Sequence, residues 1–568
     1  MPPTPYEYLD RVYEVLGYRG RPFLKHAWRE IIEHEIVVVE APTGYGKTTL
    51  SQAFTLYSLD TGFKTTISYP LRTLLEDQYK KFTELMRRLG YRDLVGTRYM
   101  HHRDSYYFVK PVTLTTVDTL SMTLFGLEPS DLDKVIGGIY GSITHTLGHY
   151  LFARATTLLS NLVLDEVHLL ADTTRSLNFL ASLILIAYQN GCRLLLESAT
   201  LPESYLETLR RIHSGIHVVR FNESIDPEFI EERESKEINY EKPSKINDSD
   251  SKYKQIIEWL RLARKEIGSK GFRALIVFNT VSEAIEMYDQ LIKTEFKDID
   301  IYLLHSRFRE SDRRSKIMEL KHKMELLKES LDKKIQSSIN YIVIATQVIE
   351  AGVDITSNVF ITDIAPANSL IQRLGRFLRY PGEKYGFLRI WYEDAIDETY
   401  KVYDGGLVKN TLDQLNCIGN KFNPHIPRAY RRLINNVYSI KDYRVDYSEV
   451  MDFIGLTLSL TSPHNAVKKF LELGGSFIRD TLLIPVTTED IVKEGNPLEA
   501  IIPLSSMNLR RKAIVGKLVR DKDGEYRVSE VTKEELRNIL KLSLSEDFIA
   551  LVIRGRYDPI KGLILGDK

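Results

Sequence analysis

The sequence has few cysteines, no long apolar run and no recognisable leader. Its two cysteines, Cys192 and Cys417, are too few for a disulfide framework and lack metal-ligand spacing, which favours a reducing, cytoplasmic setting. No stretch of about 18 uncharged apolar residues occurs, so no membrane-spanning helix is expected. The first residues carry acidic side chains rather than a basic stretch followed by an apolar one, so no secretory signal is expected.

The chain also lacks net charge. Lysine plus arginine and aspartate plus glutamate both number 77. This balance argues against a protein that coats nucleic acid through its overall field, although a local basic channel is compatible with it. The length of 568 residues suits about three or four domains of roughly 150 residues each.

The stretch "VVVEAPTGYGKTTL" lacks one expected glycine, because Ala41 stands where a phosphate-binding loop usually begins with glycine. The apolar run 36–39 reads as a buried parallel strand followed by a sharp turn. The turn would direct backbone N–H groups at a phosphate, the lysine would reach the terminal phosphates, and Thr48 would ligate magnesium at a helix start. The loop residues predicted to bind nucleotide are Thr43, Gly44, Gly46, Lys47, Thr48 and Thr49.

Short apolar runs alternate with helical patterns twice along the chain, which predicts two α/β halves with parallel sheets covered by helices. The expected boundaries are 1–225 for the first half, 226–254 for an exposed charged linker and 255–400 for the second half. Residues 401–568 form an accessory domain in which no motif is recognised. A charged helical stretch over 309–336 is expected to be a solvated insertion in the second half.

Two acidic residues, Asp165 and Glu166, follow the apolar strand of "NLVLDEVHLLAD". Asp165 would hold magnesium opposite Thr48, and Glu166 would act as the base for the water that attacks the terminal phosphate. After the next strand, Ser198 and Thr200 of "LLLESATLP" would hydrogen-bond towards the acidic pair and sense the terminal phosphate.

The second half contains "IATQVIEAGVDI" and "DIAPANSLIQRLGRFLRY", in which Gln372, Arg373, Arg376 and Arg379 recur at helical spacing. Arginine is suited to neutralising phosphate charge in a transition state. ATP is therefore expected between the halves, with its binding closing them and its hydrolysis reopening them.

Taken together, these motifs resemble those of superfamily 2 helicases of the DExH type. The segments "IVFNTVSEAIEMYDQL", "LLHSRFRESDR" and "ITDIAPANSLIQRLGR" are further similar to the CRISPR-associated DExH helicase that serves type I interference. The resemblance covers about residues 21–380. It implies two tandem RecA-like domains and 3′ to 5′ movement along single-stranded DNA after a guide-RNA (Cascade-type) complex has opened the duplex.

The resemblance also assigns roles to residues. Catalytic roles fall to Lys47, Asp165, Glu166, Gln372, Arg376 and Arg379, and Gly352 and Asp354 join the ATP site, with Mg²⁺ held by Thr48 and Asp165. Contacts to the sugar-phosphate backbone fall to Pro70, Arg72, Thr116, Asp118, Asn279, Thr280, His305, Arg307 and Thr346. Contacts of this kind make movement indifferent to sequence.

Two departures from the family pattern matter. No glutamine that would read adenine occurs near "RPFLKHAWREI", which leaves nucleotide selectivity open. Many members carry an HD nuclease domain marked by a histidine-aspartate pair, but none of the 13 histidines here precedes aspartate. The cluster His101, His102 and Asp104 reads as surface histidines rather than a metal site. A stand-alone helicase subunit with a separate HD nuclease is therefore expected, an arrangement most frequent in archaeal type I-A systems.

Two alternatives remain open. The chain could be a DExH helicase that acts on RNA or in DNA repair, against which the "LLHSRF" and "TDIAP" segments weigh. It could also be a nucleotide-gated assembly clamp that binds ATP but barely hydrolyses it. The intact acidic pair and arginines favour a working ATPase.

Overall fold

Two compact units make up the chain, each built from more than one segment. The first comprises residues 1–226, 439–482 and 537–546, and the second comprises residues 227–438, 483–536 and 547–568. The computed structural model describes residues 3–99, 102–127, 148–246, 249–335, 337–393, 402–458, 463–481, 483–492, 501–506, 509, 513–521, 524–543, 545 and 547–565. Among these residues, no helix combines the length and apolarity that a bilayer crossing demands.

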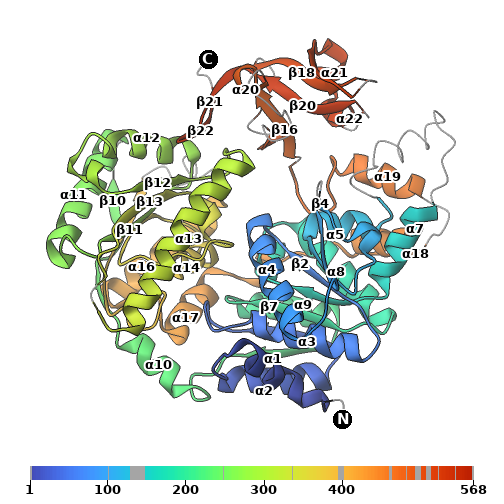
Figure 1. Cartoon of the computed structure of the whole chain (residues 1–568), viewed down its shortest axis with the longest axis horizontal. Coiled ribbons are helices and arrows are strands. Elements are labelled where there is room, and N and C mark those ends of the chain that lie inside the picture. Colours follow the sequence, from blue (N-terminus) through green and yellow to red (C-terminus); the bar gives the residue numbers. More distant parts are fainter. Residues whose placement is uncertain are drawn as a thin grey trace. The chain divides into compact units, whose positions relative to one another are not determined.

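The first unit is organised around a sheet with the strand order β4-β3-β5-β2-β6-β7-β1-β8. Its strands are β1 (Ile36–Glu40), β2 (Thr65–Tyr69), β3 (Val95–Tyr99), β4 (His102–Arg103), β5 (Val112–Thr116), β6 (Asn161–Leu164), β7 (Leu194–Ser198) and β8 (Ile216–Arg220). Neighbouring strands run parallel except β3 and β4. Helices surround the sheet (Figure 1), and the expected parallel α/β fold is confirmed.

Burial explains why these runs form central strands. β1, β2, β5, β6 and β7 are buried along their whole length. Since successive side chains of a strand point to opposite faces, both faces of the sheet must be covered. The covering helices are α1 (Tyr8–Leu16), α2 (Pro22–Glu33), α3 (Thr48–Asp60), α4 (Arg72–Arg88), α5 (Val117–Leu124), α7 (Gly148–Leu158), α8 (Thr174–Gln189) and α9 (Glu203–Ile212).

The second unit repeats this design with the strand order β10-β15-β14-β11-β13-β12. Its strands are β9 (Glu237–Tyr240), β10 (Ser244–Ile246), β11 (Arg273–Val277), β12 (Ile301–Leu304), β13 (Tyr341–Ala345), β14 (Val359–Asp363) and β15 (Tyr385–Glu393). Its helices are α10 (Pro227–Glu234), α11 (Ser249–Ile267), α12 (Val281–Leu291), α13 (Glu310–Asp332), α14 (Ala367–Leu374), α16 (Gly405–Ile418) and α17 (Pro427–Val437).

Alternate side chains of the second sheet enter two separate cores. Leu275 and Val277 of β11 pack with α13, α14, α16 and α17, whereas Ala274 and Ile276 pack with α11 and α12. The charged helix α13 buries Leu320, Met324 and Leu327 in the first of these cores. The stretch expected to be a solvated insertion is therefore a covering helix of the sheet.

The expected linker over 226–254 needs correction. β9 pairs in parallel with Tyr385–Leu388, and β10 pairs in parallel with Trp391–Glu393, so both extend one edge of the second sheet along β15. Tyr240 and Ile246 at the ends of these strands are buried. Backbone pairing, which composition does not reveal, orders this charge-rich segment.

Residues 401–568 do not form one accessory domain, as the sequence suggested. Helices α16 and α17 pack on the second sheet, whereas α18 (Tyr447–Leu458) and α19 (Pro463–Glu472) belong to the first unit. α18 contacts α8, and the ring of Phe125 lies 5.3 Å from that of Phe453 and 4.5 Å from that of Phe477. Apolar contacts thus return the chain to the first unit, where α18 and α19 lie near α7 and α8 (Figure 1).

The remaining C-terminal residues form a small sheet with the order β17-β16-β20-β18-β19, followed by a hairpin. The strands are β16 (Leu483–Thr488), β17 (Ile502–Ser505), β18 (Ile514–Arg520), β19 (Tyr526–Ser529), β20 (Phe548–Ile553), β21 (Gly555–Asp558) and β22 (Gly562–Leu565), and the short helices are α20 (Glu489–Val492), α21 (Lys533–Arg537) and α22 (Ile539–Ser543).

The β21–β22 hairpin is held by the segment that follows β12. The His305 ring donates through Nε2 to the Lys561 carbonyl at 2.9 Å, and its Nδ1 accepts from the Arg307 N–H at 3.2 Å. The Leu563 N–H donates to the Arg307 carbonyl at 2.8 Å. Tyr557 accepts from the Arg309 N–H at 3.2 Å and lies under the Arg309 guanidinium.

These bonds correct the expectation that His305 contacts nucleic acid. The ring is fully buried and both of its nitrogens have partners within the chain. Burial lowers the pKa of His305 to about 3, so the ring is neutral at physiological pH. The role of the Arg307 guanidinium as a phosphate contact stays a prediction.

Gly562 is where this docking is most sensitive to substitution. Its φ of +74° favours glycine, and an added Cβ would lie 2.7 Å from both the Arg307 carbonyl oxygen and the His305 Cε1 atom. We expect Gly562→Ala to release the hairpin, seen as faster amide hydrogen exchange across Gly555–Leu565.

Gly524→Ala is the matched control, because φ there is +87° but the nearest atom to an added Cβ belongs to the flexible Arg520 side chain at 3.4 Å. If the amide hydrogens of the hairpin exchange equally fast in the Gly562→Ala variant and in the parent chain, the role of Gly562 in docking the hairpin is contradicted.

Candidate functional site

The loop between β1 and α3 has the conformation of a phosphate-binding turn. Gly44 and Gly46 take positive φ values of 78° and 105°, which glycine adopts without strain. Ala41 is not among the positive-φ residues, so the position of the missing glycine does not require one. The Lys47 ammonium donates to the Ala41 carbonyl at 3.2 Å, and Thr48 begins α3.

The loop is anchored through Tyr45, a residue that the sequence analysis did not single out. Its buried hydroxyl donates to Asp226 at 2.7 Å, and its ring packs against Phe23 and Phe221 at centroid distances of 5.9 and 5.0 Å. The Arg21 guanidinium lies 5.3 Å above the Tyr45 ring. An aromatic residue inside a glycine-rich loop is the signal that could have indicated an anchor.

Asp165 and Glu166 lie at the carboxyl end of β6, on the same sheet edge as the loop after β1. The Asp165 carboxylate accepts from the Glu166 N–H at 2.9 Å. Glu166 has φ 52° and ψ 46°, a left-handed conformation that is unfavourable for a glutamate and is characteristic of functional sites. Burial and the neighbouring Glu166 carboxylate raise the pKa of Asp165 to about 7, and the Lys47 ammonium opposes this rise.

A third carboxylate, Glu197, was missed by the sequence analysis. It lies in β7, between β6 and β1, and accepts a hydrogen bond from the Ser51 hydroxyl at 2.5 Å. Burial and the Asp165 carboxylate raise its pKa well above the ordinary range. A charged residue inside the apolar run "LLLES" was the available signal.

The carboxylates of Asp165, Glu166 and Glu197 (the carboxylate cluster) interact electrostatically at this edge, and their oxygens are of the type that a divalent cation binds. Glu166 Oε2 and Glu197 Oε1 are buried and make no hydrogen bond with the described residues. Hard cations such as Mg²⁺ prefer carboxylate and hydroxyl oxygens, and Thr48 supplies a hydroxyl at the start of α3.

His168 links the acidic pair to the segment after β7. Its Nδ1 lies 2.9 Å from the Ser198 hydroxyl and 3.4 Å from Glu166 Oε2. The Ser198 hydroxyl in turn accepts from the Thr200 N–H at 3.3 Å. Burial lowers the pKa of His168. The contact expected between this segment and the acidic pair therefore runs through His168.

In the second unit, Arg373 is the centre of a buried network. Its guanidinium donates to Glu350 at 2.9 Å, to Asn279 at 2.8 Å and to Tyr403 at 2.8 Å. The Asn279 amide also donates to the Ile364 carbonyl at 2.8 Å. The predicted nucleic-acid contact Asn279 is thus a buried member of this network.

The two candidate catalytic arginines differ in their surroundings. Arg376 is buried and donates to the carbonyls of Ile349 and Glu350 at 3.0 and 3.1 Å, which fixes the turn after β13. Arg379 pairs with Asp354 at 3.1 Å, and its Nη1 is buried without a hydrogen-bond partner among the described residues. Asp354 also pairs with Lys328 at 3.0 Å.

The remaining predicted residues of the second unit lie at the carboxyl ends of its strands or just after them. Thr280 caps α12 by accepting from the Glu283 N–H at 3.4 Å. Thr346 follows β13 and is buried, Gly352 has a φ of 82°, and Gln372 is buried in α14.

The predicted nucleic-acid contacts of the first unit lie after β2 and β5. Pro70 follows β2, Arg72 begins α4, and Thr116 caps α5 by accepting from the Thr119 N–H at 3.3 Å. Asp118 accepts two hydrogen bonds from Arg479, each 2.7 Å long. Arg479 comes from the returning segment after α19, so sequence order gave no sign of this pair.

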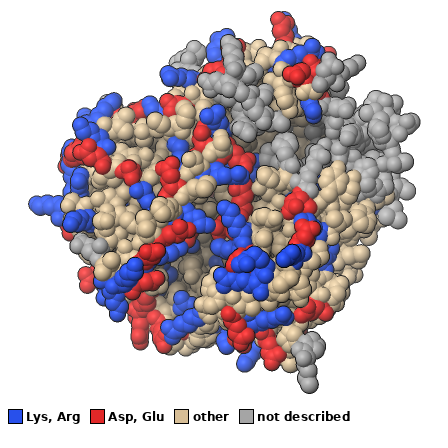
Figure 2. Space-filling view, viewed as in Figure 1, with Lys and Arg blue, Asp and Glu red and all other residues tan. Residues whose placement is uncertain are grey.

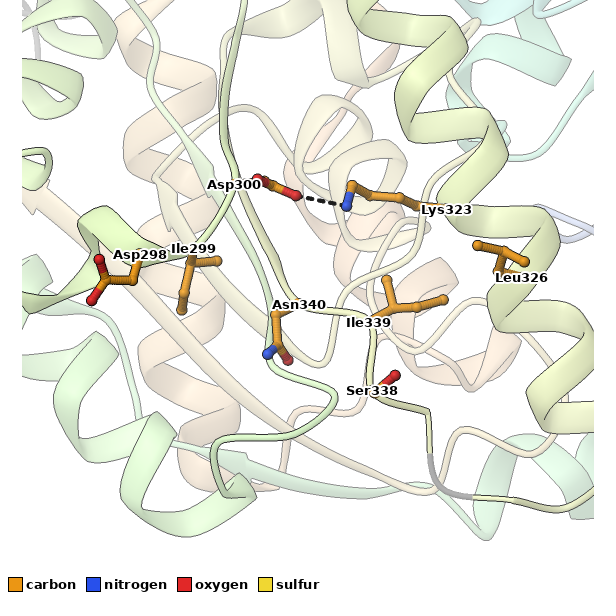
Figure 3. Close-up of a pocket in the computed structure, with 8 residues that line it drawn as sticks. All are labelled: Asp298, Ile299, Asp300, Lys323, Leu326, Ser338, Ile339 and Asn340. Carbon is orange, nitrogen blue, oxygen red and sulfur yellow. Dashed lines mark hydrogen bonds and ion pairs between the residues drawn. The ribbon is translucent and has the colours of Figure 1, made fainter.

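Outside this edge, Asp104 accepts from Lys110 at 3.2 Å and from Tyr79 at 3.3 Å, whereas His101 lies outside the described residues. A cavity of about 350 Å³ is lined by residues that include Lys323 and Asp300, which form an ion pair at 2.8 Å. Figure 3 shows the two side chains pointing toward each other. The cavity lies at the amino ends of β12 and β13, opposite the edge that carries the motifs, and does not contribute to the site.

Comparisons with known proteins agree with this geometry. Residues 21–209 match the DEAD/DEAH box helicase family, and residues 270–382 match the C-terminal family of the CRISPR-associated nuclease/helicase Cas3. A putative CRISPR-associated nuclease/helicase Cas3 of Methanocaldococcus jannaschii is 26% identical over 61% of this chain and 39% of its own length. The Cas3 of Methanothermobacter thermautotrophicus is 27% identical over 72% of this chain and 46% of its own.

Solved structures give the same fold. The crystal structure of T. fusca Cas3 matches with a TM-score of 0.61 and 16% identity over 99% of this chain and 72% of that one. Its ATP complex matches with a TM-score of 0.59 at 16% identity, covering the same shares of both chains. A chain of a CRISPR RNA-guided surveillance complex before nicking matches with a TM-score of 0.54 and 16% identity over 96% of this chain and 69% of that one.

The chain spans less than half the length of the two curated relatives described above. The chain carries a DEAD/DEAH box helicase domain followed by a Cas3-like helicase C-terminal domain, and it is homologous to Cas3 nuclease/helicases.

Proposed function

We propose that this protein is an ATP-driven 3′ to 5′ translocase on single-stranded DNA that serves type I CRISPR interference. The observation that carries the proposal is the carboxylate cluster beside Lys47, held at the carboxyl ends of β6, β7 and β1. Neighbouring buried carboxylates are costly unless a proton or a cation neutralises them, and carboxylates perturbed in this way cluster at functional sites.

In this mechanism the chain's own residues divide the work. The turn N–H groups and Lys47 would hold the β- and γ-phosphates. Thr48 and Asp165 would hold Mg²⁺, which would supply positive charge to the phosphates. Glu166 accepts a hydrogen bond from the attacking water and takes its proton as the new P–O bond forms and ADP leaves. His168 and Ser198 then relay the change at Glu166 to the segment after β7.

We assign the positive charge from the second unit to Arg379 rather than to Arg376. The guanidinium of Arg376 is already bonded to two main-chain carbonyls, whereas Arg379 keeps a nitrogen with no hydrogen-bond partner in the described part of the chain. Asp354 would position Arg379 through their ion pair until the terminal phosphate replaces the carboxylate.

The proposed DNA contacts are local, because the chain carries no net charge. Figure 2 shows lysine and arginine interspersed with aspartate and glutamate on the visible face. Residues after the strands, such as Arg72 and Thr280, are suited to backbone contacts that ignore sequence. The partners we propose are a guide-RNA (Cascade-type) complex of the I-A type and an HD nuclease on a separate chain.

Removing the groups that handle the phosphate should abolish ATP hydrolysis. We expect Lys47→Ala and Glu166→Gln each to lower kcat about 100-fold or more, with Glu166→Gln still binding ATP because only the base is lost. Steady-state phosphate release measures the rate, and a fluorescent ATP analogue measures binding.

Lys468→Ala and Glu472→Gln are the controls, since these exposed residues form an ion pair on α19. Hydrolysis at the parental rate in Glu166→Gln would refute the site. A parent chain that binds ATP without turnover would instead favour the assembly clamp.

The nucleic acid that drives the motor can be identified by comparing unstructured single-stranded DNA and RNA of equal length. We expect DNA to raise the ATPase rate at least about tenfold more than RNA when both are tested at the same low salt concentration. Equal or greater stimulation by RNA would contradict the DNA assignment and favour a helicase that acts on RNA.

A further inference from the structure

A histidine-carboxylate cluster lies at the opposite end of β1 from the phosphate loop. Glu30 and His34 are four residues apart on α2, with His34 capping the helix. His217 lies in β8, whose residue pairs with β1 place it beside Val37. Because β1 begins two residues after His34 and pairs with β8, the fold itself brings the three side chains together.

The ligand atoms of the three residues converge. The His217 Nε2 lies 2.8 Å from Glu30 Oε2, and the His34 Nδ1 lies 3.8 Å from the same oxygen. One ligand atom from each residue lies within 4.8 Å of the other two. The imidazole rings of His34 and His217 stack with a centroid distance of 3.8 Å and an interplanar angle of 8°.

The backbone beneath the cluster is fixed before any ligand binds. Arg193 donates through Nη1 to the carbonyls of Ile31, Ile32 and His34 at 2.9, 3.1 and 3.1 Å, which satisfies the end of α2. The His34 Nδ1 lies 3.1 Å from the Glu30 carbonyl. Either nitrogen of the His34 ring can bind a metal once the ring turns, and Nδ1 already lies 3.8 Å from Glu30 Oε2.

We propose that Glu30, His34 and His217 form a binding site for a divalent transition metal of the Zn²⁺ type. Two imidazoles and one carboxylate are a donor set that such ions accept, with a fourth position left for water. The stacked rings must turn so that their lone pairs converge, and their side-chain exposures of 37% and 35% leave them room to do so. His26, whose Nδ1 lies 3.9 Å from Glu30 Oε1, flanks the site.

A metal here would connect the end of α2 to β8, the edge strand of the first sheet. Metal binding would stabilise this edge without touching the ATP site, because the two sites lie at opposite ends of β1. The proposal does not depend on the proposed ATPase, since its readouts are metal binding and spectroscopy.

The test uses the full chain, with any affinity tag removed and bound metal stripped, titrated with Zn²⁺ against a chromophoric chelator. We expect one equivalent to bind with a micromolar or lower Kd, and His34→Ala or His217→Ala to weaken binding at least about tenfold. Co²⁺ should give the visible absorption of a four-coordinate site, and this absorption should disappear in His217→Ala.

His322→Ala is the matched control, because the exposed side chains of His322 and Glu325 on α13 lie 4.0 Å apart and have no third ligand among the described residues. It should leave the Zn²⁺ affinity unchanged. Circular dichroism shows whether each variant is folded, and Glu30→Gln, which keeps the side-chain shape, should also weaken binding. The proposal is overturned if the folded His34→Ala/His217→Ala variant binds Zn²⁺ as tightly as the parent chain does. It is also overturned if the parent chain does not bind Zn²⁺.

Discussion

The candidate site depends on electrostatic repulsion among the buried carboxylates of Asp165, Glu166 and Glu197. Burial and mutual repulsion raise the pKa values of Asp165 and Glu197, and the nearby ammonium of Lys47 offsets only part of this effect. Each unit of pKa shift corresponds to about 1.4 kcal/mol of differential interaction between the two protonation states. A cation bound at this edge would reduce the repulsion among the carboxylates. Binding of a nucleotide together with its metal ion would therefore neutralise negative charge at this edge of the sheet.

Sheet topology makes this concentration of charge possible. β7 lies between β6 and β1, so the acidic pair, Glu197 and the phosphate loop all meet at neighbouring strand ends. Parallel strands place their carboxyl ends on one edge, where loops can carry function on a rigid support. The left-handed backbone at Glu166 and the anchored Tyr45 add local constraint. The site is therefore largely arranged before its ligand arrives.

The arginines that follow β14 in the second unit have two kinds of surroundings. Arg373 and Arg376 donate to groups within the unit and fix the turn after β13. Arg379 forms an ion pair with Asp354, and its Nη1 has no hydrogen-bond partner among the residues that the structure describes. In the sequence, their helical spacing made these arginines look equivalent. Their hydrogen-bond partners distinguish the structural arginines, Arg373 and Arg376, from Arg379, which is available for chemistry.

Sequence patterns were sufficient for most of the fold. Apolar runs identified β1, β6 and β7, because parallel strands that are buried on both faces are rich in apolar residues. They failed for β3, β9 and β10, where polar residues such as Arg98 and Glu237 are held by backbone pairing.

For the candidate site, local sequence motifs predicted the loop after β1 and the acidic pair. Tyr45–Asp226, Arg479–Asp118 and His305–Lys561 were not predictable, because each joins residues far apart in sequence and leaves no periodic signal.

The central claim is that the second unit supplies a charge needed for hydrolysis but not for nucleotide binding. Single-turnover hydrolysis of ATP by the Arg379→Ala variant, measured beside its ATP affinity, tests this claim most directly. The account predicts an affinity within about threefold of the parent chain and a hydrolysis rate reduced about 1,000-fold. A hydrolysis rate equal to that of the parent chain would contradict it.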